Sequence, residues 1–277
     1  SVVVPVNLGA VDPAALAERL RAAAGDGVLA FGAYVWAEDL LQRVLRAVRR
    51  QGFEGLVVLG GPQVSYAPGG LEGLYPQADA FVRGYGEQAL VALAQSPRGA
   101  PIVGVHWAGQ PDRARQAQVD LQALPSPWLE GTIPLAGQRF IRWEAQRGCP
   151  FRCSFCQHRE AGARLAHREL ATDRVDAEID AFCAAGVQDI AVLDPIFNAG
   201  ARSAAILERF AGHGFPGRLS LQARAELMSP RFLEAAAALD VRLEFGLQTV
   251  HADEGAAVRR RNHMPKVDAA LARVRQA

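Results

Sequence analysis

Lysine and methionine are scarce in this 277-residue sequence, in which Lys266 is the only lysine and only two residues are methionine. The 30 basic residues are nearly all arginine and balance 29 acidic ones, so the formal net charge of +1 gives no general attraction to nucleic acid or to anionic membranes. No apolar run approaches the length of a membrane span. The first residues lack the charged start and long apolar centre of a signal peptide. These absences predict a cytoplasmic protein with no nucleic-acid or membrane partner.

Cysteine is also scarce, and its distribution is uneven. Three of the four cysteines, Cys149, Cys153 and Cys156, fall within eight positions, and the fourth is Cys183. A secreted domain held together by disulfides is usually shorter and has more evenly spread cysteines. The cluster therefore indicates a metal site or redox chemistry.

Strand-like and helix-like segments alternate in the first part of the chain. We expect strands at residues 2–8, 27–34, 55–59, 80–83 and 101–105, and helices at 14–24, 38–50 and from 88 onward. Such alternation predicts an α/β domain with a mostly parallel sheet and ligands at the carboxyl ends of its strands. We place this first domain at residues 1–108. Residues 109–138 contain four prolines and little periodicity, which is typical of a linker.

The alternation resumes in a second domain, at residues 139–277. We expect strands at 140–146, 189–193, 218–223 and 242–246, and helices at 172–185, 203–212, 230–238 and toward 276. These make four βα units, whereas a closed barrel needs eight. A six-stranded open barrel would need two more. We therefore expect a partial barrel that is truncated after about four strands.

The cysteines form a Cys-x3-Cys-x2-Cys loop directly after a predicted strand. Three thiolates on one tight loop can each bind one iron of a 4Fe–4S cluster, which leaves the fourth iron open to a small molecule. Structural zinc is the alternative, but it needs four ligands, and the nearest candidate is His158, two positions after Cys156. Three unrelated buried thiols would be a coincidence.

The loop resembles the signature of the radical-SAM superfamily, with Gly148 before the first cysteine and Phe155 before the third. The resemblance implies that the open iron chelates S-adenosylmethionine (SAM), and that Phe155 contacts SAM. Further stretches are similar to the SAM-binding strands of that family. They imply SAM contacts for Asp194, Phe197, Arg224, Gln248 and Arg261, although Gln222 stands where relatives often have a glutamate.

Residues in the first domain resemble the cobalamin-binding domain that precedes the barrel in the largest methylase subfamily. The resemblance implies cobalamin contacts at the predicted strand ends, from Tyr34, Trp36, Gly60, Gly61, Pro62, Gln63, Gly84, Gly86 and Glu87. The Asp-x-His-x-x-Gly loop, whose histidine binds cobalt in mutase-type domains, does not occur in the sequence. We therefore expect base-off cobalamin without a histidine ligand.

Together these resemblances imply a cobalamin-dependent radical-SAM methyltransferase. Its fold would consist of a Rossmann-like cobalamin-binding domain followed by a radical-SAM barrel. It would move a methyl group from SAM via methylcobalamin to a carbon of a small-molecule or peptide natural-product precursor. The cysteine loop is also similar to that of the tryptophan 2-C-methyltransferases of thiopeptide biosynthesis, which suggests the indole C2 as one acceptor. An electron donor such as flavodoxin or ferredoxin is expected. The alternatives are a radical-SAM cobalamin enzyme that forms or rearranges rings, and a non-catalytic fragment that binds the cluster and the corrinoid.

Overall fold

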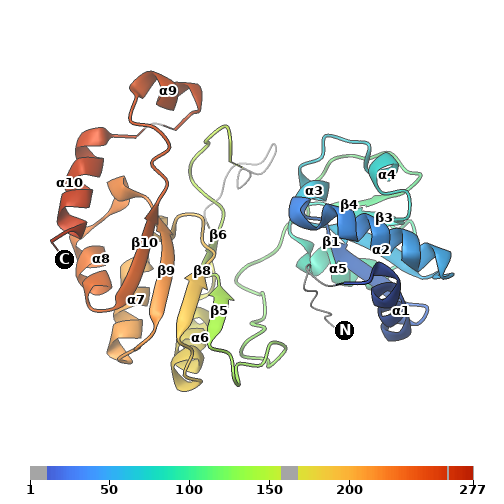
Figure 1. Cartoon of the computed structure of the whole chain (residues 1–277), viewed down its shortest axis with the longest axis horizontal. Helices are drawn as coiled ribbons and strands as arrows, with labels where there is room; N and C mark the ends of the chain where they lie inside the picture. The colour runs from blue at the N-terminus through green and yellow to red at the C-terminus, as the bar shows by residue number, and fades with distance from the viewer. Residues whose placement is uncertain (1–10, 157–167, 261, 277) are drawn as a thin grey trace. The chain divides into compact units, whose positions relative to one another are not determined.

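The computed structural model of the chain describes residues 11–156, 168–260 and 262–276. It contains two compact units, Ser1–Val119 and Asp120–Ala277 (Figure 1). The strand expected at residues 2–8 and the predicted SAM contact Arg261 lie outside the described residues. No helix in the described part of the chain is long and apolar enough to span a bilayer.

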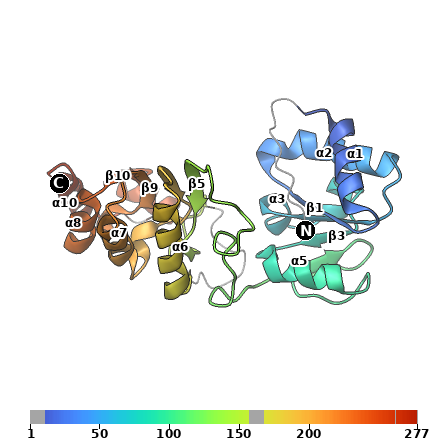
Figure 2. The same cartoon turned by 90° about the horizontal axis from the view of Figure 1, so that it is seen from below.

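The first unit is built on a four-stranded sheet in the order β1-β2-β3-β4. Strands β1 (Val28–Gly32), β2 (Leu56–Gly60) and β3 (Ala80–Val82) are parallel, and β4 (Val105–Trp107) pairs antiparallel with β3. Helices α1 (Pro13–Ala24) and α2 (Glu38–Arg50) lie on one face, and α5 (Gly86–Gln95) lies on the other (Figure 2). The short helices η1 (Val35–Ala37), α3 (Pro62–Ser65) and α4 (Leu71–Leu74) follow strand ends or loops.

Alternation along β2 explains why helices cover both faces of this sheet. Val57 and Leu59 pack in the cluster that includes α1 and α2, whereas Leu56 and Val58 pack in the cluster that includes α5. Successive side chains of a strand point to opposite faces, so a strand that is apolar at every position is buried on both sides. The continuous apolar run Leu-Val-Val-Leu thus gives a sheet covered by helices on both faces.

The prediction of a strand at residues 101–105 is wrong. The strand begins only at Val105, and the preceding residues form a turn in which the Val105 N–H donates to the Ile102 carbonyl at 3.1 Å. Short apolar runs occur in both strands and buried turns, so composition alone did not separate them.

The proline-rich segment 109–138 contains no helix or strand. Its first part contacts the first unit, where the Ala117 N–H donates to the Arg83 carbonyl at 2.8 Å. Its later part contacts the second unit, where the Ser126 hydroxyl donates to Glu178 at 2.5 Å. The linker boundaries at 109 and 138 stay a prediction.

The second unit has a parallel sheet in the order β10-β9-β8-β5. The strands are β5 (Phe140–Trp143), β8 (Asp189–Val192), β9 (Arg218–Ala223) and β10 (Asp240–Phe245). Helices α6 (Thr172–Ala184), α7 (Ser203–Gly212) and α8 (Pro230–Ala237) cover one face of it (Figures 1 and 2). The four predicted βα units are present, with α9 (Ala252–Ala257) and α10 (Met264–Val274) after the last strand.

The first strand of this unit is shorter than predicted. Residues 140–146 do not form one strand, because β5 ends at Trp143 and a separate strand β6 (Gln146–Arg147) pairs antiparallel with β7 (Arg168–Glu169). Between them, the backbone N–H of Ala145 donates to the side chain of Asp194 at 2.9 Å instead of to a neighbouring strand. This side-chain contact redirects the chain into the cysteine loop.

Candidate functional site

The cysteine loop follows β6, beyond the carboxyl end of β5. Cys149 and Cys153 are buried, and Cys156 is partly exposed. Burial raises the pKa of the Cys149 thiol, and the nearby Cys156 and Cys153 raise it further, while Arg224 opposes the shift. The Cys149 thiol therefore lies within electrostatic reach of both other thiols.

Among the residues that the structure describes, no three His, Cys, Asp or Glu side chains are grouped so that they could hold a single metal ion. A 4Fe–4S cluster takes each thiolate on a different iron, so its ligands lie farther apart than those of one zinc ion. His158, the candidate zinc ligand, lies outside the described residues.

Asp194 lies just after β8 and is completely buried. Its Oδ1 accepts hydrogen bonds from the backbone N–H groups of Ala145 at 2.9 Å and Gln146 at 3.2 Å. Desolvation raises the pKa of Asp194 to about 7, against the two hydrogen bonds, which lower it. The structure thus gives Asp194 a role in shaping the approach to the cysteine loop, and its predicted contact with SAM stays a prediction.

Arg224 lies at the carboxyl end of β9, next to the cysteine loop. Its guanidinium carbon is 3.8 Å from the centre of the Phe151 ring, and it forms an ion pair with Glu226 at 3.3 Å. Asn198 fixes the Arg224 backbone, because its amide accepts from the Arg224 N–H at 2.9 Å and donates to the Arg224 carbonyl at 2.8 Å. Sequence reasoning did not select Asn198, although it directly follows Phe197.

Arg260 is a second cation beside the cysteines. Its Nη1 lies 3.8 Å from the sulfur of Cys153. Both Arg224 and Arg260 line a small cavity at the carboxyl ends of β9 and β10. The sequence-based prediction named Arg261, which lies outside the described residues, and did not include Arg260, because spacing along a loop does not reveal which side chains face the cysteines.

The other predicted SAM contacts in the described part of the chain differ in their exposure to solvent. Phe155 is 51% exposed, and Gln248 is exposed with a positive φ of 71°. Phe197 is buried, with its ring centre 6.1 Å from that of Phe232. The structure therefore brings Arg224 to the cysteines but packs Phe197 into the core.

The predicted cobalamin contacts of the first unit lie at the carboxyl ends of β1, β2 and β3. Gly61 adopts a positive φ of 90°, and a Cβ there would meet the carbonyl oxygen of Ala33 at 3.0 Å. The Ala33 N–H donates to the Gly60 carbonyl at 2.7 Å, and the Gln63 N–H donates to the Ala33 carbonyl at 3.2 Å. Only glycine suits such a left-handed, crowded position. The turn from Gly60 to Gln63, which includes Pro62, is thereby held against the end of β1.

Tyr34 and Trp36 follow β1 and form an exposed aromatic pair. Their rings stack with centres 4.7 Å apart and an interplanar angle of 22°. Trp36 is 69% exposed, and Val35 between them is 70% exposed. Exposed apolar side chains grouped at a sheet edge are typical of a binding surface.

Arg83 connects the turn that follows β2 to the turn that follows β3. It is buried, and its Nη1 donates to the carbonyls of Val64 and Ala67, both at 2.8 Å. The next residue, Gly84, donates its N–H to the Ser65 hydroxyl at 3.0 Å. This positions Gly86 and Glu87 in the first turn of α5. Residues 83–87 form an Arg-Gly-x-Gly-Glu segment, in which the sequence-based prediction named Gly84, Gly86 and Glu87 but not Arg83.

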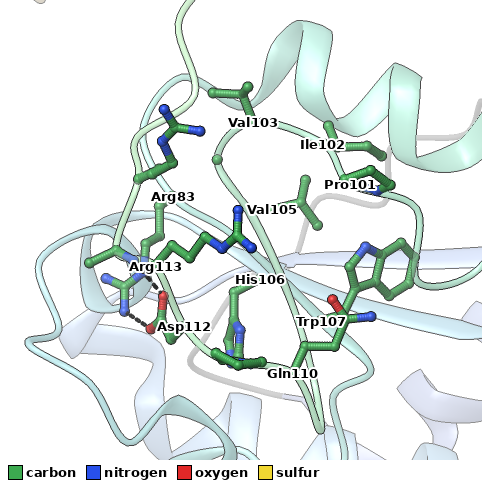
Figure 3. A pocket seen from close by; sticks show the side chains of 14 residues that line it. Arg83, Pro101, Ile102, Val103, Val105, His106, Trp107, Gln110, Asp112 and Arg113 are labelled. Carbon is green, nitrogen blue, oxygen red and sulfur yellow. Dashed lines mark hydrogen bonds and ion pairs between the residues drawn. The ribbon is translucent and has the colours of Figure 1, made fainter.

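A cavity of about 190 Å³ lies between β4 and the loop that carries Asp112 and Arg113. Figure 3 shows Arg113 reaching toward Val105 across this cavity, and Arg83 paired with Asp112 at 2.5 Å. The loop that lines the cavity continues to the strand-end turns, where the Gln116 side-chain amide donates to the Ser65 carbonyl at 2.9 Å and the Tyr85 N–H donates to the Ala117 carbonyl at 3.2 Å. These contacts fix the loop against the ends of β2 and β3.

Comparison with known proteins identifies the second unit. The family profile of the Radical SAM superfamily matches residues 143–277. The chain is 33% identical over 187 residues to the 2-(S-pantetheinyl)-carbapenam-3-carboxylate methyltransferase of Streptantibioticus cattleyicolor, which covers 61% of this chain. It is 30% identical over 225 residues to the cobalamin-dependent radical SAM methyltransferase TokK of Streptomyces tokunonensis, which covers 74% of this chain.

The fold is also similar to solved structures of the radical SAM methyltransferase TsrM from Kitasatospora setae. The structure with tryptophan substrate and a SAM analog has a TM-score of 0.74 and covers 96% of this chain at 17% identity. The structure with cobalamin and a 4Fe–4S cluster has a TM-score of 0.73 at the same coverage and identity.

The chain spans 27% and 31% of the two curated relatives' own lengths, and 57% and 59% of the two TsrM chains. The profile match contains the cysteine loop and continues through the last three strands of the parallel sheet. The family expected from the cysteine spacing is confirmed. This chain carries a domain of the radical SAM superfamily.

Proposed function

We propose that this chain is the cobalamin-binding and cluster-binding part of a cobalamin-dependent radical-SAM methyltransferase. The first unit would be a Rossmann-like cobalamin domain, and the four parallel strands of the second would belong to a (β/α)6 barrel. When bound, the cluster supplies one-electron chemistry, SAM supplies the methyl group and cobalamin carries it.

The grouping of three thiols with Arg224 at the strand ends carries the proposal. The thiols would bind three irons of the cluster, and a guanidinium can hold the SAM carboxylate in a fork. Ligands of parallel sheets bind beyond the carboxyl ends of the strands, where these residues lie. The TokK relative supports the assignment of cobalamin, because its name states that dependence.

Base-off cobalamin is supported by the environment of His106, the only histidine among residues 1–119. It is buried, stacks on Phe81 with ring centres 5.6 Å apart, and its Nε2 lies 3.1 Å from Glu72. It belongs to β4, whereas the predicted cobalamin contacts follow β1, β2 and β3. The exposed Tyr34–Trp36 pair would pack against the corrin instead.

The methyl acceptor would be a carbon of a natural-product precursor. The named relatives act on a pantetheinyl carbapenam carboxylate and, in TsrM, on tryptophan. We propose a small-molecule acceptor of this kind, with the indole C2 of tryptophan as the first to test. A flavodoxin or ferredoxin would supply electrons. Ring formation or rearrangement stays the alternative reaction, and it differs in product mass because methylation adds one CH2 equivalent.

Cluster binding is tested by anaerobic reconstitution of the full chain and by iron and sulfide analysis. We expect about four irons per chain, as one 4Fe–4S cluster requires. Cys153→Ser should lose most of this iron, whereas the matched control Cys183→Ser, on α6, should retain it. Equal iron in both variants would contradict the cysteine assignment.

Methyl transfer is tested with SAM that carries a deuterated methyl group, hydroxocobalamin, a low-potential reductant and each candidate acceptor. A labelled methyl group in the product supports the proposed reaction. A product without added mass supports ring formation or rearrangement. Binding of cluster and corrinoid without any SAM turnover supports the non-catalytic alternative.

A further inference from the structure

The segment after β10 folds back onto the cysteine loop. The backbone N–H of Ser154, between the second and third cysteines, donates to the Val258 carbonyl at 2.9 Å. These residues are about a hundred positions apart in the sequence, so the contact is tertiary and not a local turn. The loop that would hold the cluster is therefore fixed in part by the residues that follow α9.

Arg260 makes the side-chain contact of this segment with the cysteines. Its Nη1 lies 3.8 Å from the Cys153 sulfur, and its Nη2 donates to the Gly246 carbonyl at the end of β10. Its backbone N–H donates to the Gly255 carbonyl at 2.7 Å. A Cβ at Gly255 would lie 2.7 Å from the Arg260 carbonyl oxygen, so glycine is needed for this close approach.

One polar atom of Arg260 has no partner in the described part of the chain. Its Nε is buried and makes no hydrogen bond there. A buried N–H without a partner is unfavourable, and it is relieved when an acceptor such as a sulfide or a carboxylate occupies the site. The side chain thus offers a further N–H beside the one that faces the Cys153 sulfur.

We propose that Arg260 raises the reduction potential of the cluster by placing a fixed positive charge and N–H donors beside the Cys153 thiolate. The inference rests on the proposed function, because it requires that Cys153 binds the cluster. Reduction adds one electron from a low-potential donor and makes the cluster more negative by one charge. A nearby cation stabilises that reduced form more than the oxidised form, and hydrogen bonds to cluster sulfurs act in the same direction.

Two neighbouring arginines in the described part of the chain, Arg259 and Arg224, do not share this position. Arg259 is exposed, so water screens its charge. Arg224 lies over the Phe151 ring and pairs with Glu226, which offsets much of its charge. Among the described arginines, the effect on potential should therefore belong to Arg260.

The test compares Arg260→Met, Arg260→Gln, Arg260→Lys and the matched control Arg259→Met in the full, reconstituted chain. Iron content is measured first, and the midpoint potential follows from a dithionite titration monitored by electron paramagnetic resonance. We expect Arg260→Met and Arg260→Gln to shift the reduction equilibrium about tenfold toward the oxidised form, which is about 59 mV for a one-electron couple. Arg260→Lys should keep most of the wild-type potential, and Arg259→Met all of it.

Equal potentials for Arg260→Met and Arg259→Met would overturn the inference while leaving the cluster assignment intact. Absence of a cluster from the wild-type chain would instead overturn the proposed function. If Arg260→Met binds too little iron to titrate, the comparison of Arg260→Gln with Arg260→Lys decides. A lower potential for the glutamine variant supports the inference, and equal potentials contradict it. If neither of these variants binds iron, Arg260 is needed for assembly alone, which also contradicts the inference.

Discussion

Individual buried polar side chains fix the backbone around the cysteine loop. Asp194 holds the residues that lead into the loop, and Asn198 holds Arg224 beside it. The Asp194 carboxyl group accepts two backbone hydrogen bonds, and its other oxygen has no partner among the described residues, so it is finely balanced between its charged and neutral forms. Stability of the second unit should therefore depend on the protonation of Asp194.

Asp194→Asn should flatten the dependence of stability on pH. The pKa of Asp194 is about 7 in the folded chain against an ordinary 3.8. Between these values the folded state retains a proton that the unfolded chain releases, so the wild type loses stability as pH rises from about 4 to about 7. Asparagine still accepts the two backbone hydrogen bonds but does not titrate. Urea unfolding at several pH values measures the slope.

The control for this prediction is Asp189→Asn, an exposed position at the start of β8, the strand that precedes Asp194. It should leave the slope between pH 4 and pH 7 as in the wild type. An unchanged slope in Asp194→Asn would mean that the buried carboxyl does not hold its proton in this range.

At the scale of the elements, a buried polar network joins α6, β5 and the proline-rich segment. Glu178 accepts hydrogen bonds from the Trp143 indole at 2.7 Å, the Ser126 hydroxyl at 2.5 Å and Arg174 at 3.0 Å. Its side chain is completely buried, and that of Arg174 is 12% exposed. The Glu178 carboxylate thus links helix α6, strand β5 and the proline-rich segment.

Glu178→Gln should destabilise the second unit by about 2 to 4 kcal/mol, because it removes the charge that balances the largely buried Arg174. The matched control is Glu208→Gln, whose ion pair with Arg231 at 2.6 Å is exposed to solvent and should contribute little. Urea unfolding of both variants at neutral pH makes the comparison. Similar midpoints would show that the buried charge is not needed.

Elements with a regular apolar pattern could be predicted from the sequence, whereas those defined by a single contact could not. The pattern of residues 38–50 predicted α2 to the residue, and the apolar alternation of residues 218–223 predicted β9. The end of β5 depends on Asp194, which is about fifty positions away in the sequence. The inward turn of Arg260 depends on Gly255 and Gly246 in the same way. The candidate cluster ligands could be predicted from spacing alone, because three cysteines on one short loop lie near one another without contacts from distant residues.

For the whole molecule, the two units have separate cores. Within the described part of the chain, the clusters that pack against the sheet of the first unit contain no residue beyond Ala117. The predicted cobalamin contacts belong to the first unit and the cysteines to the second. Binding of the two cofactors should therefore be separable.

A chain in which Cys149, Cys153 and Cys156 are all replaced by alanine should still bind hydroxocobalamin with wild-type affinity. Equilibrium titration of the corrin absorption measures this. Gly61→Val should weaken the same binding at least tenfold, because its side chain would press on Ala33 in a left-handed backbone position. Gly69→Ala, at a position with open space, is the matched control. Loss of binding in the cysteine variant would contradict separate sites.

The exposed aromatic pair after β1 also gives the chain a built-in optical probe. Of the four tryptophans, Trp107 and Trp143 are buried and Trp128 is partly exposed, so water-soluble quenchers reach Trp36 first. Its fluorescence therefore reports on the strand end where the corrin is proposed to lie, without any label. A ligand that covers Trp36 would protect it from acrylamide, and one that binds elsewhere would leave the quenching unchanged.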